Sequence, residues 1–134
     1  MREDLQAFIY TEKLLEQLYR RAAALATLET ERQAMLTAAS NAAKNAEYLN
    51  YFYKQNFGVN FDPMVPDIVI QGGYREVINE IIKLEIRSFL DLRKQTYNQS
   101  DVAYRDTIHA ITDTKLGHIL TLLAILTNLN APEK

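Results

Sequence analysis

Apolar residues recur with the 3.6-residue period of an amphipathic helix along four long segments of this chain, about residues 3–28, 30–56, 74–97 and 101–129. Few residues interrupt these segments, because the 134 residues include only four Gly and three Pro. A sandwich or barrel of short strands needs a turn every few residues, so this composition excludes an all-β fold. The pattern predicts an all-α four-helix bundle, formed by a single domain over residues 1–134.

The connections between the predicted helices are of two kinds. Residues 30–33 (Thr-Glu-Arg-Gln) have the form of a capping box, and residues 98–101 (Asn-Gln-Ser-Asp) combine turn residues with a helix N-cap. These short connections predict two antiparallel hairpins. Residues 58–73 form the one long connection, which reaches about 50 Å when extended, whereas a 26-residue helix is about 39 Å long. It can therefore cross the bundle and place the third helix parallel to the second, although up-and-down connectivity stays open.

The net charge and the absence of cysteine exclude several classes of function. The 15 basic and 17 acidic residues give a formal charge of -2, so no strong field would attract nucleic acid or an anionic membrane. The longest nearly uncharged stretch, residues 118–131, is shorter than the roughly 20 residues of a membrane span. The absence of Cys excludes disulfides, Cys-ligated zinc and thiol nucleophiles, and it suits the reducing cytoplasm, where we expect the protein.

Polar side chains occupy positions in every predicted helix that the apolar period assigns to the core. They are Glu12 in the first helix, Asn45 in the second, Glu85 in the third, and Lys115 and His118 in the fourth. Each lies near the middle of its helix, so helix packing would bring them into one buried layer. Buried ionisable groups are costly unless they are paired or ligated. A metal site, an acid/base site and a structural ion-pair network all fit this pattern, and periodicity alone does not choose among them.

Several further features, taken in order along the chain, match a known family. Tyr19 follows Glu12 by seven residues, the second helix ends with Phe52, Tyr53 and Gly58, the crossover contains Pro, and Tyr74 opens the third helix. In these features the chain resembles the ferritin-like and rubrerythrin-like four-helix bundles, in a short bacterial form associated with spore-forming organisms. The resemblance implies a di-iron site with ligands in the order Glu, Glu-x-x-His, Glu, Glu-x-x-His over the four helices. The resemblance also adds association with the spore to the cellular locations that we expect for the protein.

This chain keeps only half of the ligand pattern that the resemblance implies. The Glu of the first helix is Glu12, that of the third is Glu85, and the His of the fourth is His118. The Glu-x-x-His of the second helix falls on Ala42 and Asn45, and the Glu of the fourth helix falls on Lys115. The two lost Glu are those that usually bridge the metals in this family, and a lysine ammonium has no lone pair to offer.

We therefore predict that an ion-pair network replaces the metal centre, in which Lys115 and, if it is protonated, His118 balance Glu12 and Glu85 beside Asn45. This interpretation gives a non-catalytic bundle with no cofactor and a structural or protein-interaction role. The alternative is a residual site in which Glu12, Glu85 and His118 hold a single Fe, Mn or Zn ion, in a metal-binding protein or an oxidoreductase of the same family.

Two neighbouring features bear on these predictions. Glu47, which offers another register for a decayed ligand pair, shares a helical face with Lys44 and Lys54, so we expect it to point to solvent. An aromatic cluster ends the second helix, and its members cannot all face one core: Tyr48, Tyr51, Phe52, Tyr53, Phe57 and Phe61. We expect part of this cluster to pack under the crossover. The aromatic residues that the crossover does not cover lead us to predict a homodimer through the face of the first and second helices.

Overall fold

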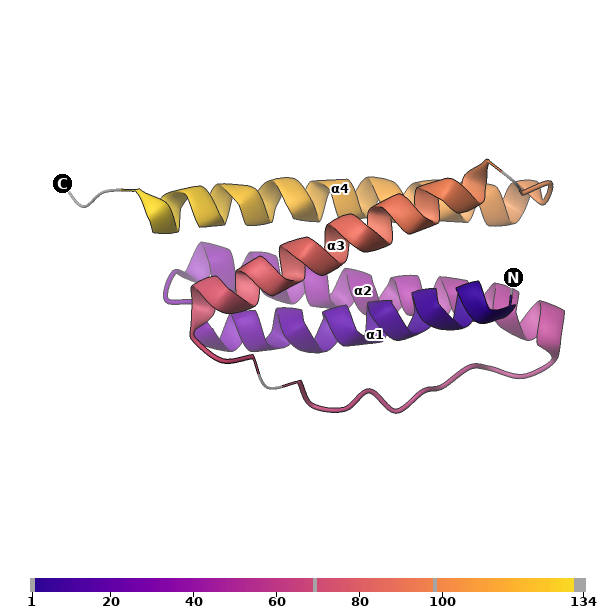
Figure 1. Cartoon of the computed structure of the whole chain (residues 1–134), viewed down its shortest axis with the longest axis horizontal. Helices are drawn as coiled ribbons and strands as arrows, with labels where there is room; N and C mark the ends of the chain where they lie inside the picture. The colour runs from indigo at the N-terminus through magenta and orange to yellow at the C-terminus, as the bar shows by residue number, and fades with distance from the viewer. Residues whose placement is uncertain (1, 69, 98, 132–134) are drawn as a thin grey trace.

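The computed structural model describes residues 2–68, 70–97 and 99–131, which form four helices and, within these ranges, no strand (Figure 1). The helices are α1 (Arg2–Leu25), α2 (Glu29–Phe57), α3 (Tyr74–Thr96) and α4 (Val102–Asn130). The predicted all-α class is confirmed, and each helix ends within about three residues of its predicted bound.

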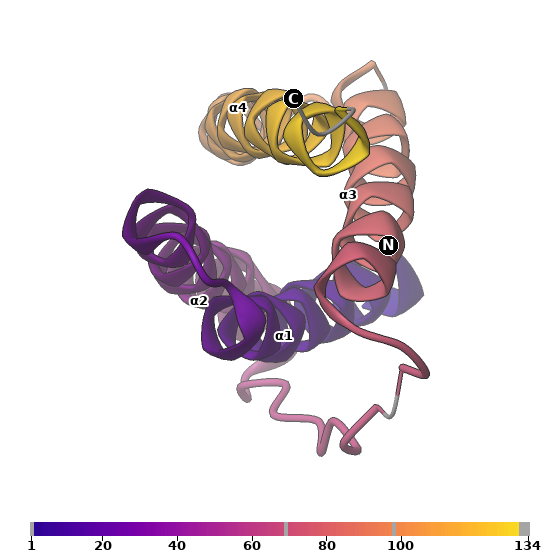
Figure 2. The ribbon, with the colours of Figure 1, turned by 90° about the vertical axis from the view of Figure 1, so that its left-hand side faces the viewer.

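The crossover determines how the two hairpins are arranged. In Figure 1 the crossover runs the length of the bundle from the end of α2 to the start of α3, so α3 runs parallel to α2 and α4 parallel to α1. The end-on view in Figure 2 places α1 beside α2 and α3, and α4 beside the same two helices. Within the described residues, the backbones of the diagonal pairs, α1 with α4 and α2 with α3, do not approach each other closely. The predicted pair of antiparallel hairpins, joined by one long crossover, is confirmed.

Only one of the three helix starts discussed next follows its sequence signal, that of α4. The Asp101 carboxylate accepts a hydrogen bond from the Tyr104 N–H at 3.2 Å and caps α4 as predicted, while Asn98, in the same predicted turn, lies outside the described residues. The predicted capping box at residues 30–33 is wrong. Helix α2 already begins at Glu29, and its N-cap residue, Leu28, makes no side-chain cap hydrogen bond, so Thr30 lies inside the helix.

A third cap, which the sequence did not reveal, starts α3. The Glu76 carboxylate accepts a hydrogen bond from the Gly73 N–H at 2.8 Å. Gly72 has a φ of 107°, and a Cβ there would lie 2.5 Å from Glu76 Cγ. Both the backbone conformation and the close approach of Glu76 therefore require glycine at position 72.

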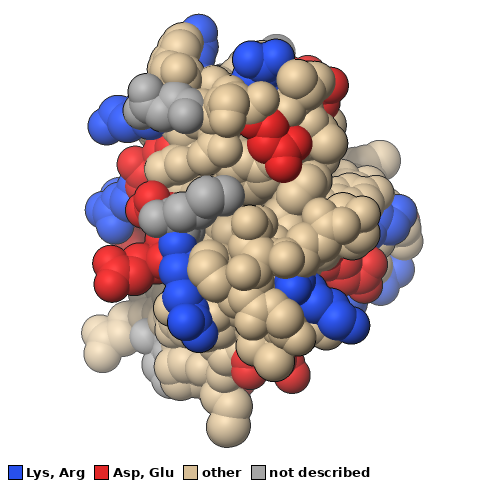
Figure 3. Space-filling view, turned by 90° about the vertical axis from the view of Figure 1, so that its right-hand side faces the viewer, with Lys and Arg blue, Asp and Glu red and all other residues tan. Residues whose placement is uncertain are grey.

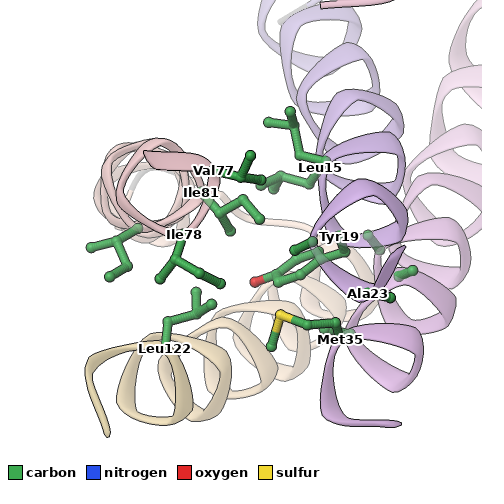
Figure 4. Close-up of a cluster of buried hydrophobic side chains, with 14 of the residues drawn as sticks. Leu15, Tyr19, Ala23, Met35, Val77, Ile78, Ile81 and Leu122 are labelled. Atoms are coloured by element: carbon green, nitrogen blue, oxygen red, sulfur yellow. The ribbon is translucent and has the colours of Figure 1, made fainter. Parts of the chain in front are cut away.

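The core consists of two apolar clusters at opposite ends of the bundle. Figure 4 shows the first, where Tyr19 of α1, Met35 of α2, Ile78 of α3 and Leu122 of α4 meet. The second contains Leu5, Phe8, Phe52, Tyr104 and Ile108, among others. Leu18 and Tyr104 are also part of this core, whereas Phe89 and Leu129 are only half-buried. Ala26, which follows the last residue of α1, is half-buried as well.

Part of the aromatic cluster at the end of α2 packs under the crossover, as expected. The Tyr53 ring lies 4.8 Å from that of Phe57 and 5.7 Å from that of Phe61, between centroids. Asn50 donates to and accepts from the Phe61 backbone, and Gln17 donates to the Val65 carbonyl at 3.2 Å. These contacts hold the crossover against α1 and α2, whereas Tyr48 and Tyr51 remain exposed.

Helix α4 is, in the described part of the chain, the one helix that is long and apolar enough to cross a membrane by length and composition alone. Its most apolar 18-residue window has a mean hydropathy of 1.2, a value that a core helix of a bundle also reaches. Because α4 packs on α2 and α3 and carries the buried Lys115, the structure is consistent with the predicted absence of a membrane span. On the end of the bundle seen in Figure 3, acidic and basic side chains are interspersed rather than gathered by sign.

Candidate functional site: a buried polar layer

A layer of polar side chains separates the two apolar clusters. Glu12 comes from α1, Asn45 from α2, Glu85 from α3 and Lys115 from α4, and each is at least 95% shielded from solvent. The helical period that fills the clusters above and below with apolar residues places these four on the same inner stripes. All the predicted site residues, His118 included, are thus brought to one level of the bundle, where only pairing can offset their burial.

Lys115 forms the centre of this layer. Its ammonium Nζ lies 2.8 Å from Glu85 Oε1 and forms a second ion pair with Glu12 Oε1. All three side chains are 1% exposed. Removing one member of such a buried pair typically costs about 3–5 kcal/mol, because the remaining charge is left without a partner. The layer is therefore a three-residue ionic unit that connects α1, α3 and α4.

Glu85 has the richest set of partners in the layer. Besides Lys115, it accepts a hydrogen bond from the Tyr19 hydroxyl at 2.7 Å and contacts His118 Nδ1 at 3.0 Å. Burial raises the pKa of Glu85, but the charge of Lys115 and the hydrogen bonds from His118, Lys115 and Tyr19 outweigh it and lower the pKa to about 2. Glu85 is therefore ionised at neutral pH.

Glu12 is in a poorer environment than Glu85. Apart from Lys115 it has one hydrogen-bond donor, Asn45 Nδ2, at 3.5 Å. Burial raises the pKa of Glu12 by more than Lys115 lowers it, and the like charge of Glu85 adds to the increase. For Lys115, burial alone would lower the pKa, but the two carboxylates raise it above its usual value. The ammonium therefore stays protonated between two carboxylates of opposite pKa shift.

His118 links the layer to the surface. Its side chain is 13% exposed, its Nδ1 faces Glu85, and its Nε2 lies 3.1 Å from Asn41 Nδ2. One ring nitrogen thus faces a buried carboxylate and the other a side-chain amide. The Tyr19 ring packs edge-on against the imidazole, with 5.5 Å between centroids.

Sequence reasoning missed two members of this network, Tyr19 and Asn41. Tyr19 lies seven residues after Glu12, and this spacing, which places both on one helical face, is the signal that could have found it. Asn41 lies one turn before Asn45 on α2, and this spacing is the signal that could have found it. Glu47 is exposed, as its shared face with lysines predicts.

Two pockets open between α2 and α4, one on each side of the layer. The first, here called the His118 pocket, has a volume of about 210 Å³ and is lined by Tyr19, Ala34, Met35, Asn41, His118 and Thr121, among others. The second, the Asn45 pocket, has a volume of about 260 Å³ and includes Asn45, Tyr48, Ala110 and Thr114. His118 of the first pocket contacts Glu85, and Asn45 of the second contacts Glu12.

The polar layer does not have the ligand set of a two-metal carboxylate site. No group of three or more His, Cys, Asp or Glu side chains able to hold a metal ion occurs among residues 2–68, 70–97 and 99–131. Glu12, Glu85 and His118 do converge, but the ammonium of Lys115 lies between the two carboxylates. The residues present do not fit a two-metal carboxylate centre, which needs bridging carboxylates where this chain has a cation.

The fold and the site together define a single-crossover four-helix bundle with a buried ionic unit at its centre. No family model matches the sequence, and no curated protein matches it. Among solved structures, a hypothetical protein from Pyrococcus furiosus is similar, with a TM-score of 0.78 and 18% identity over 94% of this chain and 87% of that one. At this identity the similarity shows a common fold alone.

Proposed function

We propose that this protein is a ferritin-like bundle in which an ion-pair network stands in place of a metal centre, and that its role is structural or in protein interaction rather than catalytic. The observation that carries the proposal is the position of Lys115 Nζ, in contact with both Glu12 and Glu85. A protonated amine has no lone pair for a metal, and its charge repels a second cation.

The charge balance of the layer supports this assignment. A metal centre of the ferritin and rubrerythrin type offsets its buried carboxylates with divalent cations. Here the Lys115 ammonium contacts both carboxylates and offsets part of their charge, and His118, if protonated, offsets the rest. This charge balance supports a layer without a metal.

A residual metal site is the second candidate. Glu12, Glu85 and His118 surround one region of the bundle, and two carboxylates with one imidazole suit a single Fe, Mn or Zn ion. Such a site requires Lys115 to lose its proton or leave, and the pKa of Lys115 is raised because the carboxylates outweigh burial. This argument favours the metal-free network.

Metal titration under anaerobic conditions tests the two candidates. The purified chain is equilibrated with Fe(II), Mn(II) or Zn(II), and bound metal is measured by mass spectrometry beside the variants Lys115→Glu and Lys83→Glu. We expect only traces of metal in the parent chain and in Lys83→Glu, whose lysine is exposed, and clear uptake in Lys115→Glu. Two irons per parent chain would end the proposal, and one metal lost on Glu12→Gln would establish the residual site.

The interaction role is supported by exposed apolar side chains on two faces. Tyr48 and Tyr51 are 53% and 60% exposed on α2. Large apolar residues are also exposed on α3 and α4, among them Ile86, Leu90, Leu116, Leu120 and Leu123. The proposed homodimer through α1 and α2 predicts a concentration-dependent dimer that Tyr51→Ser weakens and Leu120→Ser leaves intact. Analytical ultracentrifugation at micromolar concentrations measures this. A monomer throughout contradicts the dimer, and the reverse sensitivity moves the contact to α3 and α4.

A further inference from the structure

Helix α4 keeps much of its apolar surface outside the core of the bundle. Its most apolar 18-residue window has a mean hydropathy of 1.2, yet only 33% of that window is buried. Leu116, Leu120 and Leu123 are exposed, and Leu120 is the most exposed of the three, at 61%. Figures 1 and 2 show α4 along the upper edge of the bundle, beside α3. Contiguous apolar surface of this kind marks an interaction site on a soluble protein.

The exposed leucines follow the spacing of a seam between two helices. Leu116, Leu120, Leu123 and Thr127 are separated by four, three and four residues, which is the heptad spacing of paired helices. The Thr127 hydroxyl donates to the Leu123 carbonyl at 2.8 Å, so it needs no partner outside its own helix. These four residues, here named the outer seam, extend about 16 Å along α4.

Helix α3 widens the apolar surface beside the outer seam. Glu85 and Lys115 are in contact at 2.8 Å, so the residues that follow them, Ile86 and Leu116, lie at about the same level of the bundle. Ile86 and Leu90, one turn apart on α3, are both exposed. The apolar surface therefore covers both helices of the α3/α4 hairpin and is wider than a single helix.

The charges around the outer seam favour a second copy of this chain as its partner. Residues 116–131 contain no Asp, Glu, Lys or Arg. Helices that bind an anionic membrane surface are rich in Lys and Arg beside their apolar face, and this stretch has neither. The two ends of the seam differ in charge, because Asp113 lies one turn before Leu116, whereas Arg75 donates to the Leu129 carbonyl at 2.8 Å. An antiparallel pair of seams thus places the acidic end of one copy against the basic end of the other.

An antiparallel pairing centred on Leu120 makes the seam complementary to itself, as a two-fold dimer requires. Leu116 of one copy then lies about 1.5 Å along the helix axis from Leu123 of the other. Asp113 lies opposite Thr127, two residues from the carbonyl that Arg75 contacts. A parallel pairing would instead bring Asp113 of one copy against the same carboxylate of the other, which is unfavourable.

We propose that the outer seam of α4, together with Ile86 and Leu90 of α3, binds the same surface of a second copy of this chain in an antiparallel arrangement. The inference rests on the interaction role proposed above, but the contact is separate from the dimer through α1 and α2. If both contacts form, the assembly is a tetramer, and if the α4 contact forms alone, it is a dimer. Because the seam is short, we expect a weak contact with a Kd of about 10–100 μM.

Analytical ultracentrifugation of the full chain, from about 1 μM to about 1 mM, tests this contact with the variant Leu120→Glu. Val59→Glu is the matched control, because Val59 is an apolar residue of similar exposure, 58%, on the crossover. At the highest concentration, the mass-average molecular weight of the parent chain and of Val59→Glu should approach twice that of Leu120→Glu. This ratio holds whether Leu120→Glu is a monomer or an α1/α2 dimer. Loss of the α1/α2 dimer in Tyr51→Ser should leave the effect of Leu120→Glu unchanged, so the two contacts are tested separately.

Cross-linking tests the antiparallel arrangement, since the chain contains no Cys of its own. Leu120→Cys should form a covalent dimer with a short bis-maleimide, whereas Val59→Cys should not. A mixture of Leu116→Cys and Leu123→Cys should give more covalent dimer than either variant alone. In the antiparallel pairing the mixed positions are about 1.5 Å apart along the axis, whereas each position is about 9–12 Å from its own counterpart.

Several results would overturn the proposal. One is an equal mass for the parent chain and Leu120→Glu at every concentration, and another is cross-linking of Leu120→Cys no greater than that of Val59→Cys. Stronger cross-linking of Leu116→Cys alone than of the mixture would contradict the antiparallel arrangement. If the parent chain sediments with vesicles of phosphatidylcholine and phosphatidylserine and Leu120→Glu does not, the surface binds a membrane instead. Circular dichroism establishes that each variant is folded, and the cross-linking result stands even if Leu120→Glu unfolds.

Discussion

Replacing Lys115 with Met tests whether the buried ammonium is the centre of the layer. Met has nearly the same length and flexibility as Lys but no charge, so the variant leaves Glu12 and Glu85 buried without their common cation. Both carboxylates are 1% exposed. Uncompensated burial of this kind costs about 3–5 kcal/mol, a large part of the 5–15 kcal/mol that typically stabilises a domain. We therefore expect a folded but much weakened protein.

The same change has a pH signature of definite sign. Without Lys115, burial and mutual repulsion raise the pKa of both carboxyls, so their folded forms bind protons more readily than their unfolded forms do. A group with a raised folded pKa stabilises the protein at low pH, and this contribution is lost as the pH rises through that pKa. The deficit of Lys115→Met relative to the parent should therefore shrink between pH 7 and pH 5.

The parent chain should show the opposite trend below this range. The partners of Glu85 lower its pKa from 4.5 to about 2, although burial opposes them. A group with a lowered folded pKa stabilises the protein above its unfolded pKa. This contribution is lost as the pH falls from about 4.5 towards 2.

Urea denaturation at pH 7 and pH 5, with thermal melts in parallel, measures these effects. A chain of this size loses about 4 °C in Tm per kcal/mol, so the expected decrease for Lys115→Met at pH 7 is about 12–20 °C. The control Lys83→Met removes a lysine whose side chain is 72% exposed, and it should change stability by less than about 0.5 kcal/mol. A triple variant that also carries Glu12→Gln and Glu85→Gln should recover much of the loss. The reasoning is refuted if Lys115→Met lies within about 1 kcal/mol of the parent at pH 7, or if its deficit is the same at pH 5.

Three further predictions concern single contacts, each measured by urea denaturation at pH 7. Tyr19→Phe removes the 2.7 Å hydrogen bond to Glu85 and should cost about 1.5–3 kcal/mol; a loss below about 0.5 kcal/mol would show that the bond is unimportant. Gly72→Ala should destabilise the protein by more than about 1 kcal/mol, because Gly72 has a positive φ and lies close to Glu76. Gly117→Ala should stabilise α4 by about 0.5–1 kcal/mol, because a Cβ there meets open space. Equal effects of the two substitutions would contradict this contrast. Asp101→Ala removes the N-cap of α4 and should cost about 0.5–2 kcal/mol, which Asp101→Asn should largely avoid.

The sequence predicted the bundle well because its apolar period is long and rarely broken. Four helices, one crossover and the inward positions of Glu12, Glu85 and Lys115 all follow from that period. The same period could not reveal which polar atoms meet, because this depends on the rotation of each helix about its axis. The hydrogen bond from Tyr19 to Glu85 and the role of Asn41 were missed for this reason.

The start of α2 shows a second limit of local patterns. The Thr-x-x-Gln motif at residues 30–33 matches a capping box, yet Glu29 already lies in the helix and bonds to Arg32 and Gln33. Thr30 therefore lies within the first turn and cannot act as the N-cap, and the helix starts earlier than the motif indicates.

The ionic unit also determines the alignment of the helices. Apolar side chains tolerate a shift of one helix along another, because a neighbouring turn offers a similar surface. Lys115 does not, since a slide of one helical turn, about 5.4 Å, would part it from Glu12 or Glu85 and leave a buried charge alone. We expect the three charges to favour one register of the α3/α4 hairpin on α1, because the other registers would leave a buried charge without a partner during folding.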